Sequence, residues 1–180
     1  FLFLGKCAEG IKRLVKFFYR HIVKNPIQSM LLLGIGVCLC WIYGRQIILV
    51  YGYRASDIPV HMSWINEMSR GKIFAKGVYP FGFHCMIYYL HAVFRFDTYV
   101  ILCQFFFAQV IFMHLVLLAM LKQLCKTKYI PYIGTFVFLL GNFWSGQTYS
   151  RFYATLPQEF GMIFVIPSIY FLIRFFQIPK

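Results

Sequence analysis

The residues best suited to chemistry lie in a polar stretch between two long apolar runs. Within it, Asp57 and His61 are four residues apart, and Pro59 fits the first turn of a helix, where its missing N–H costs no hydrogen bond. A carboxylate and an imidazole would then lie one helical turn apart. Such a carboxylate near a membrane surface could take a proton from an acceptor hydroxyl. The alternative is that Asp57 caps the helix and His61 packs at the interface.

The same stretch ends in a turn-forming string, Tyr79-Pro80-Phe81-Gly82, which is followed at helical spacing by His84, Tyr88 and His91. Proline fixes its own φ and glycine relaxes the backbone, so the string predicts a corner. This corner could place His84 near a phosphate group. The alternative is an aromatic belt with a turn, because aromatic residues collect at membrane interfaces in any case.

A second polar stretch, residues 145–159, contains Arg151 between Tyr149 and Tyr153. Its guanidinium could clamp a phosphate through paired hydrogen bonds, or serve the structure alone. Thr155 to Gln158 fits a helix capping box, and Glu159 would follow in the first helical turn, where the helix dipole favours an anion. This pattern favours a structural role for Thr155 through Glu159.

The elements that position these residues are apolar. The sequence is 61% hydrophobic and 13% charged with a mean hydropathy of +0.68, whereas soluble domains carry roughly 25% charged residues. About 20 apolar residues cross a bilayer core. The expected spans, about four, are 27–51, 98–121, 129–144 and 160–176. We therefore predict an all-α, polytopic transmembrane bundle with outer loops at about 52–97 and 145–159.

Shorter segments complete this plan. Phe83 to Phe96 is too short to span and predicts an interfacial helix. The short connection between 129–144 and 160–176 predicts that these two spans are antiparallel neighbours. Residues 1–26 predict a basic amphipathic segment on the cytoplasmic face. Because the sequence opens without an initiator methionine, we expect it to be a fragment.

Charge distribution gives the expected orientation and partner. Basic residues near the span ends favour a cytoplasmic N-terminus in a multi-pass protein of the cell membrane. Four acidic residues would then lie on the outer side, namely Asp57, Glu67, Asp97 and Glu159. The net charge of +13 is divided among the ends of apolar runs, which favours anionic membrane lipid as a partner and argues against nucleic acid.

Several chemistries lack a sequence signal. The six cysteines include no Cys-x-x-Cys pair, and we find no dinucleotide, Walker or His-Glu-x-x-His motif. A divalent metal is left open, without a clear ligand motif.

Arg45 lies inside the first expected span, where a charge at mid-bilayer costs about 2.5 to 3.5 kcal/mol. Its side chain could extend to the interface, or line an outer cavity and face an anionic headgroup.

Taken in order, these features resemble the amino-terminal part of the GT-C superfamily of polytopic glycosyltransferases. The resemblance rests on the basic approach, the first span, the loop with Asp57-Ile58-Pro59-Val60-His61, the Tyr79-Pro80 corner and the interfacial helix, over roughly residues 25–125. The sequence departs from that family in having no Asp-x-Asp pair.

The resemblance implies transfer of a sugar from a polyprenyl-phosphate-linked donor at the outer face. Asp57 would be the catalytic base with His61 beside it, and Arg151 or Lys76 would stabilise the leaving phosphate. His84, Tyr79 and Glu159 are further substrate-binding candidates. A different class of function is a non-enzymatic transporter or flippase-like subunit, for which Arg45 and His114 are the ionisable candidates within spans.

Overall fold

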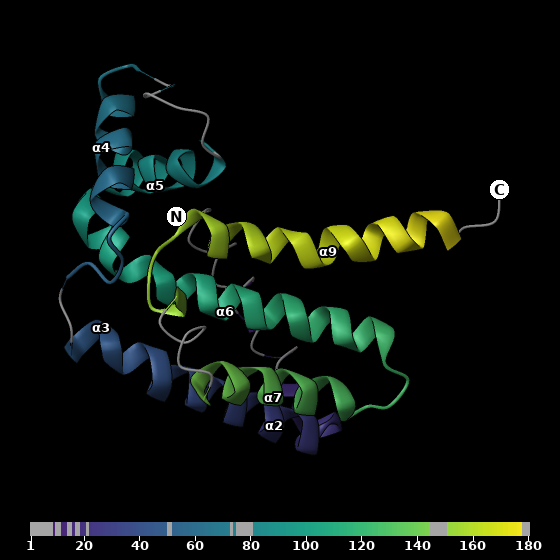
Figure 1. Ribbon diagram of the computed structural model, residues 1–180. Coiled ribbons are helices and arrows are strands. Elements are labelled where there is room, and N and C mark those ends of the chain that lie inside the picture. The colour runs from purple at the N-terminus through teal and green to yellow at the C-terminus, as the bar shows by residue number, and fades with distance from the viewer. Residues whose placement is uncertain are drawn as a thin grey trace.

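The computed structural model describes residues 9, 12–13, 16, 19–20, 22–49, 52–72, 74, 81–144 and 151–177. Every regular element in these ranges is a helix (Figure 1), which confirms the all-α prediction. The described residues among 9–24 are helical and exposed, but most of the predicted amphipathic segment lies outside the described residues.

The first long helix is a composite that covers Pro26–Leu49. It consists of α2 (Pro26–Leu39), a π-helical turn η1 (Cys40–Gly44) and α3 (Arg45–Leu49). Pro26 begins it, where a proline loses no hydrogen bond. At 1.5 Å per residue the helix is about 36 Å long, enough to cross a hydrocarbon core of about 30 Å.

Two further helices are long and apolar enough to span a membrane, α6 (Thr98–Leu124) and α9 (Pro157–Gln177). The remaining expected span, α7 (Ile130–Trp144), has 15 residues, or about 22 Å. The described residues therefore hold three full-length span candidates and one shorter apolar helix. This is the make-up of a multi-pass membrane protein.

Helix α6 is the centre of the bundle, with α9 on one side and the pair α2 and α7 on the other (Figure 1). The core on the α2–α7 side is formed by Ile35, Leu39, Ile42, Tyr43, Phe106, Val110, Leu118, Tyr132, Leu139 and Tyr153. The prediction that α7 and α9 are neighbours was wrong, because α6 separates them.

The reason is that Thr155 and Leu156, directly before α9, are hydrogen-bonded to α6. The Phe106 N–H donates to Thr155 Oγ1 over 2.9 Å, and Gln109 Nε2 donates to the Leu156 carbonyl over 3.0 Å. These buried bonds direct the chain across α6 before α9 begins. They also correct the capping-box prediction, since the Thr155 hydroxyl binds α6 and α9 starts at Pro157. Glu159 does lie in the first turn of α9, as predicted.

Two short helices, α4 (Ile58–Ser69) and α5 (Phe81–Phe94), pack together at one end of the bundle (Figure 1). We call this the α4–α5 end. A second core joins them to α6 and to the segment before α9, formed by Ile58, Ile65, Phe83, Ile87, Ile101, Leu102, Ala154 and Leu156. Helix α5 confirms the predicted short helix near 83–96, and α4 confirms the helix predicted after Asp57.

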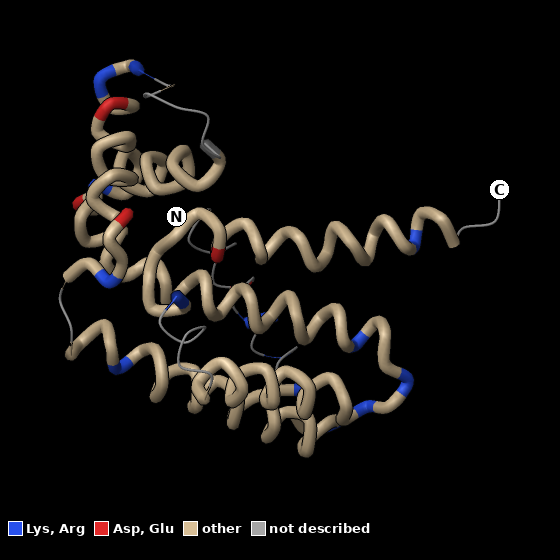
Figure 2. The backbone as a smooth tube through the Cα atoms, viewed as in Figure 1, with Lys and Arg blue, Asp and Glu red and all other residues tan. Residues whose placement is uncertain are grey.

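Charge is unevenly distributed between the two ends of the bundle (Figure 2). The acidic residues of α4, of the start of α6 and of the first turn of α9 lie toward the α4–α5 end, whereas the charged residues of the connection between α6 and α7 are lysines. The exposed lysines of that connection are Lys126 and Lys128. The grouping of Asp57, Glu67, Asp97 and Glu159 on one side of the spans therefore agrees with the sequence-based prediction.

Candidate functional site

The centre of the site is a pair of histidines from α4 and α5. His61 Nδ1 and His84 Nε2 lie 3.1 Å apart, within hydrogen-bonding distance. Both side chains are buried, with 2% and 1% of their surfaces exposed. The rings of Trp64 and Phe83 pack around them edge to face. Sequence reasoning named both histidines but did not predict that they bond each other.

Burial sets the charge state of His61. The pKa of His61 is lowered to about 4, first by desolvation and then by His84, while Asp57 opposes the shift. A buried imidazolium would lack water and face a second imidazole, so the neutral form is favoured. His61 is therefore neutral at pH 7. It can accept or donate one hydrogen bond without contributing a charge to the site.

Asp57 lies one turn before His61 and keeps its side chain in solvent. It is the residue that precedes α4, and its backbone carbonyl accepts from the N–H groups of Val60 and His61. The side chain makes no capping bond. Instead it accepts a 3.1 Å hydrogen bond from Ser56 Oγ. Asp57 therefore has a carboxylate that is exposed at the end of a helix and is not used to cap it.

Arg151 and Glu159 form an ion pair beside this helix end. Arg151 Nε donates to Glu159 Oε1 over 2.6 Å, and Nη2 donates to Gln158 Oε1 over 2.6 Å. The pKa of Arg151 is raised, mainly by Glu159 and to a smaller extent by Asp57. Asp57 is thus within electrostatic range of Arg151. The guanidinium predicted to clamp a phosphate is instead bonded to Gln158 and Glu159 in the first turn of α9, with 53% of its side chain exposed.

The segment between α3 and α4 brings a further arginine, Arg54, to the α4–α5 end. Arg54 Nη2 donates to the Gln46 carbonyl over 2.6 Å, and its guanidinium lies 5.0 Å from the Phe106 ring and 5.5 Å from the Tyr153 ring. The Tyr153 hydroxyl in turn donates to the Ile42 carbonyl in η1 over 3.2 Å. A π-turn disturbs the regular backbone hydrogen-bond pattern, and the Tyr153 hydroxyl supplies a donor to a carbonyl within that turn.

Sequence reasoning missed Arg54. The signal that could have found it was its position, directly after a span and three residues before Asp57.

No family model, curated protein or solved structure matches this chain. Its class therefore rests on its own helices, and its site on the contacts described above.

The contacts described above do not include the other residues predicted from the sequence. Lys76 and Tyr79 lie outside the described residues. Arg45 is exposed, with its guanidinium 4.8 Å from the Trp41 ring. In the described part of the chain, no three His, Cys, Asp or Glu side chains are placed to hold a metal ion together.

Proposed function

We propose that this chain is part of a membrane glycosyltransferase that transfers a sugar from a polyprenyl-phosphate-linked donor at the outer face of the cell membrane. The observation that carries the proposal is the exposed Asp57 carboxylate, one turn from the buried His61–His84 pair and within electrostatic range of Arg151. The GT-C resemblance supplies the reaction. The α4–α5 end is the proposed outer face.

The reaction would be an inverting displacement at the anomeric carbon. Asp57 takes the proton of the acceptor hydroxyl while the acceptor oxygen bonds to that carbon. The bond between the carbon and the phosphate oxygen breaks, and the lipid phosphate leaves with the electron pair. Arg151, with half of its side chain in solvent, would stabilise the added negative charge, and Lys76 is the second candidate.

His61 and His84 would position the base. A buried, bonded pair ties α4 to α5, and Asp57 directly precedes the first residue of α4. Because a catalytic group must be held near its productive geometry, loosening this joint would displace the carboxylate. In this account His61 touches no substrate, which departs from its predicted place among the catalytic residues.

His114 favours a second candidate function, a transporter or flippase-like subunit. It is buried inside α6, where Nδ1–H donates to the Val110 carbonyl over 2.8 Å and Nε2 is buried with no hydrogen-bond partner among the described residues. Ionisable residues within spans commonly mark substrate or proton paths. This candidate predicts that His114→Phe abolishes function and that Asp57→Asn does not.

The deciding experiment measures sugar transfer in membranes that contain the full-length protein, with polyprenyl-phosphate-linked sugars as donors. Asp57→Asn should lower the rate by about 10²- to 10⁴-fold, the usual contribution of a general base. Glu67→Gln is the matched control, since Glu67 pairs with Arg70 and Lys72 at the other end of α4. Unchanged transfer in Asp57→Asn would contradict the proposal, as would an equal loss in the control.

A further inference from the structure

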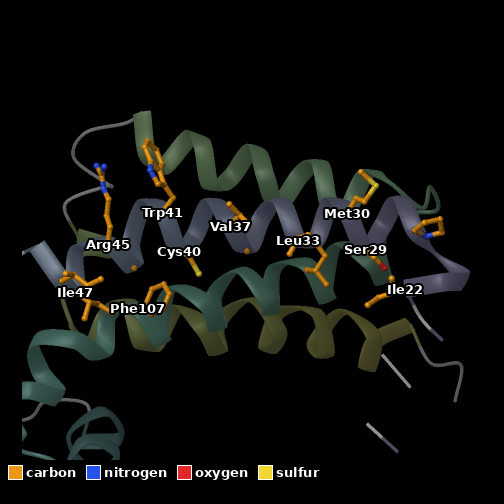
Figure 3. Close-up of a pocket in the computed structure, with 15 residues that line it drawn as sticks. Ile22, Ser29, Met30, Leu33, Val37, Cys40, Trp41, Arg45, Ile47 and Phe107 are labelled. Carbon is orange, nitrogen blue, oxygen red and sulfur yellow. The ribbon is translucent and has the colours of Figure 1, made fainter. Parts of the chain in front are cut away.

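A large apolar groove runs along the first span, away from the candidate site. Its volume is about 1420 Å³, larger than the ~300 to 1,000 Å³ of typical small-molecule pockets. One face of the composite helix α2–η1–α3 forms most of it, and Phe107 of α6 contributes a wall (Figure 3). The lining extends from Ile22 and Pro26 at one end to Arg45 and Ile48 at the α4–α5 end.

Small residues produce the hollow. Ser29, Gly36, Cys40 and Gly44 recur along the lining face at helical spacing. Bulkier side chains flank them, and these are strongly exposed: Met30 72%, Leu33 68%, Val37 59% and Trp41 59%. In Figure 3, Met30, Trp41 and Arg45 project to one side of the helix and Leu33 and Cys40 to the other, where Phe107 of α6 lies. In a bilayer this groove faces hydrocarbon.

The chemistry of the groove is asymmetric. Among the described lining residues, Arg45 alone carries a charge, and it lies at the α4–α5 end beside Trp41. A guanidinium at the edge of hydrocarbon needs an anion or water nearby. Phosphate is the anion whose oxygens match its paired N–H groups. The groove therefore presents one cation at the water boundary and an apolar channel leading from it into the membrane.

We propose that the groove binds an anionic phospholipid, with the phosphate on Arg45 and an acyl chain along Gly36, Cys40 and Gly44. The two halves of that molecule match the two halves of the groove, and such lipids are part of the surrounding bilayer. This site is independent of the proposed transferase activity, because Asp57 and the His61–His84 pair do not line it.

Trp41 reports occupancy directly, since bromine on a lipid chain quenches the fluorescence of a tryptophan that it contacts. The chain has three tryptophans, so the reporter protein carries Trp64→Phe and Trp144→Phe. It is reconstituted in bilayers that contain brominated phosphatidylglycerol or brominated phosphatidylcholine at equal mole fraction. We expect the anionic lipid to quench Trp41 several-fold more effectively, and Arg45→Gln to remove the difference.

Two glycines offer a matched test of the channel. Gly34 and Gly36 both have open space where a Cβ would be added, but of the two only Gly36 is among the described lining residues. Gly36→Phe should reduce quenching by brominated phosphatidylglycerol, whereas Gly34→Phe should leave it unchanged. Equal effects of the two variants would contradict the proposal.

Other outcomes would assign a different occupant. Equal quenching by the two headgroups would overturn the proposed selectivity of the groove for an anionic phospholipid, since both lipids carry a phosphate and differ in net charge. Displacement of brominated phosphatidylglycerol by a trace of unlabelled polyprenyl phosphate would assign the groove to that lipid. Disulfide crosslinking of two chains through Cys40, which is exposed in the groove, would assign it to a second copy.

Discussion

His61 Nδ1 and His84 Nε2 lie 3.1 Å apart across the interface of α4 and α5. The two residues are 23 positions apart in sequence, and their bond joins the two helices that extend from the end of the bundle. Around it, Ile58 and Ile65 of α4 pack in one core with Phe83 and Ile87 of α5. A hydrogen bond inside an apolar core strongly favours this one arrangement of the two helices, because no water can replace a lost partner.

His84→Ala should therefore destabilise the protein by about 1 to 3 kcal/mol, the cost of leaving a buried polar group without its partner. His84→Gln should recover part of this loss, because the Gln amide can occupy the position of Nε2. Thermal unfolding in detergent measures both. His91→Ala is the control, since the His91 side chain lies where water can replace its bond to the Phe96 carbonyl. Equal stability of His84→Ala and wild type would contradict the geometry.

Stability should depend on pH through His61. Its pKa is about 4 in the folded protein and 6.5 ordinarily, so between these values the unfolded chain binds the extra proton. The stability contributed by neutral His61 is fully present above pH 6.5 and decreases as pH falls toward 4. The loss should be about 2 to 3 kcal/mol. Unfolding temperatures measured from pH 7.5 to 4.5 give the slope of stability against pH, which His61→Asn should flatten. An unchanged slope in that variant would show that another group causes the pH dependence.

The Arg151–Glu159 pair should respond asymmetrically to substitution. Arg151 is 53% exposed and Glu159 only 11%, so removing the arginine leaves a largely buried carboxylate without its cation. We expect Arg151→Ala to cost about 1 to 3 kcal/mol and Glu159→Gln to cost less. The double variant should be more stable than Arg151→Ala alone. Strict additivity in this double-mutant cycle would show that the two side chains do not interact.

Tyr153→Phe tests the joint between the first span and the segment before α9. It removes the hydroxyl that donates to the Ile42 carbonyl and keeps the ring contact with Tyr43. Because that carbonyl belongs to a π-turn, its loss should cost about 1 to 2 kcal/mol in thermal unfolding. Tyr89→Phe, at a side chain that is 58% exposed, should have almost no effect. A loss of the same size in Tyr89→Phe would remove the special role of Tyr153.

The helices followed from sequence because apolar runs, and Pro59 in the case of α4, are local signals. Span boundaries were within a few residues, and α4 begins directly after Asp57 as predicted. The contacts between distant segments did not follow. Thr155 looked like a helix cap, yet its hydroxyl accepts from Phe106 N, 49 residues away. The local sequence pattern does not indicate which distant donor will bond to a buried hydroxyl.

For the candidate site too, single residues could be predicted from the sequence but their contacts could not. Asp57, His61, His84, Arg151 and Glu159 were selected one by one from composition and spacing. Their grouping depends on α9 crossing α6, which the short connection after α7 did not reveal, since it favoured a hairpin of neighbouring spans. Residue types that do chemistry can be read from a sequence. The partner that occupies each of them, such as Glu159 on Arg151, requires the fold.

The central claim is that the α4–α5 end lies at the outer membrane face, with the α6–α7 connection on the cytoplasmic side. Cys85, exposed on α5, and Cys125, at the end of α6, report the two sides. Two single-cysteine variants in intact cells are treated with a membrane-impermeant maleimide. We expect Cys85 to react from outside and Cys125 to react only after permeabilisation. Labelling of Cys125 from outside, with Cys85 protected, would invert the orientation and contradict the proposed site of sugar transfer.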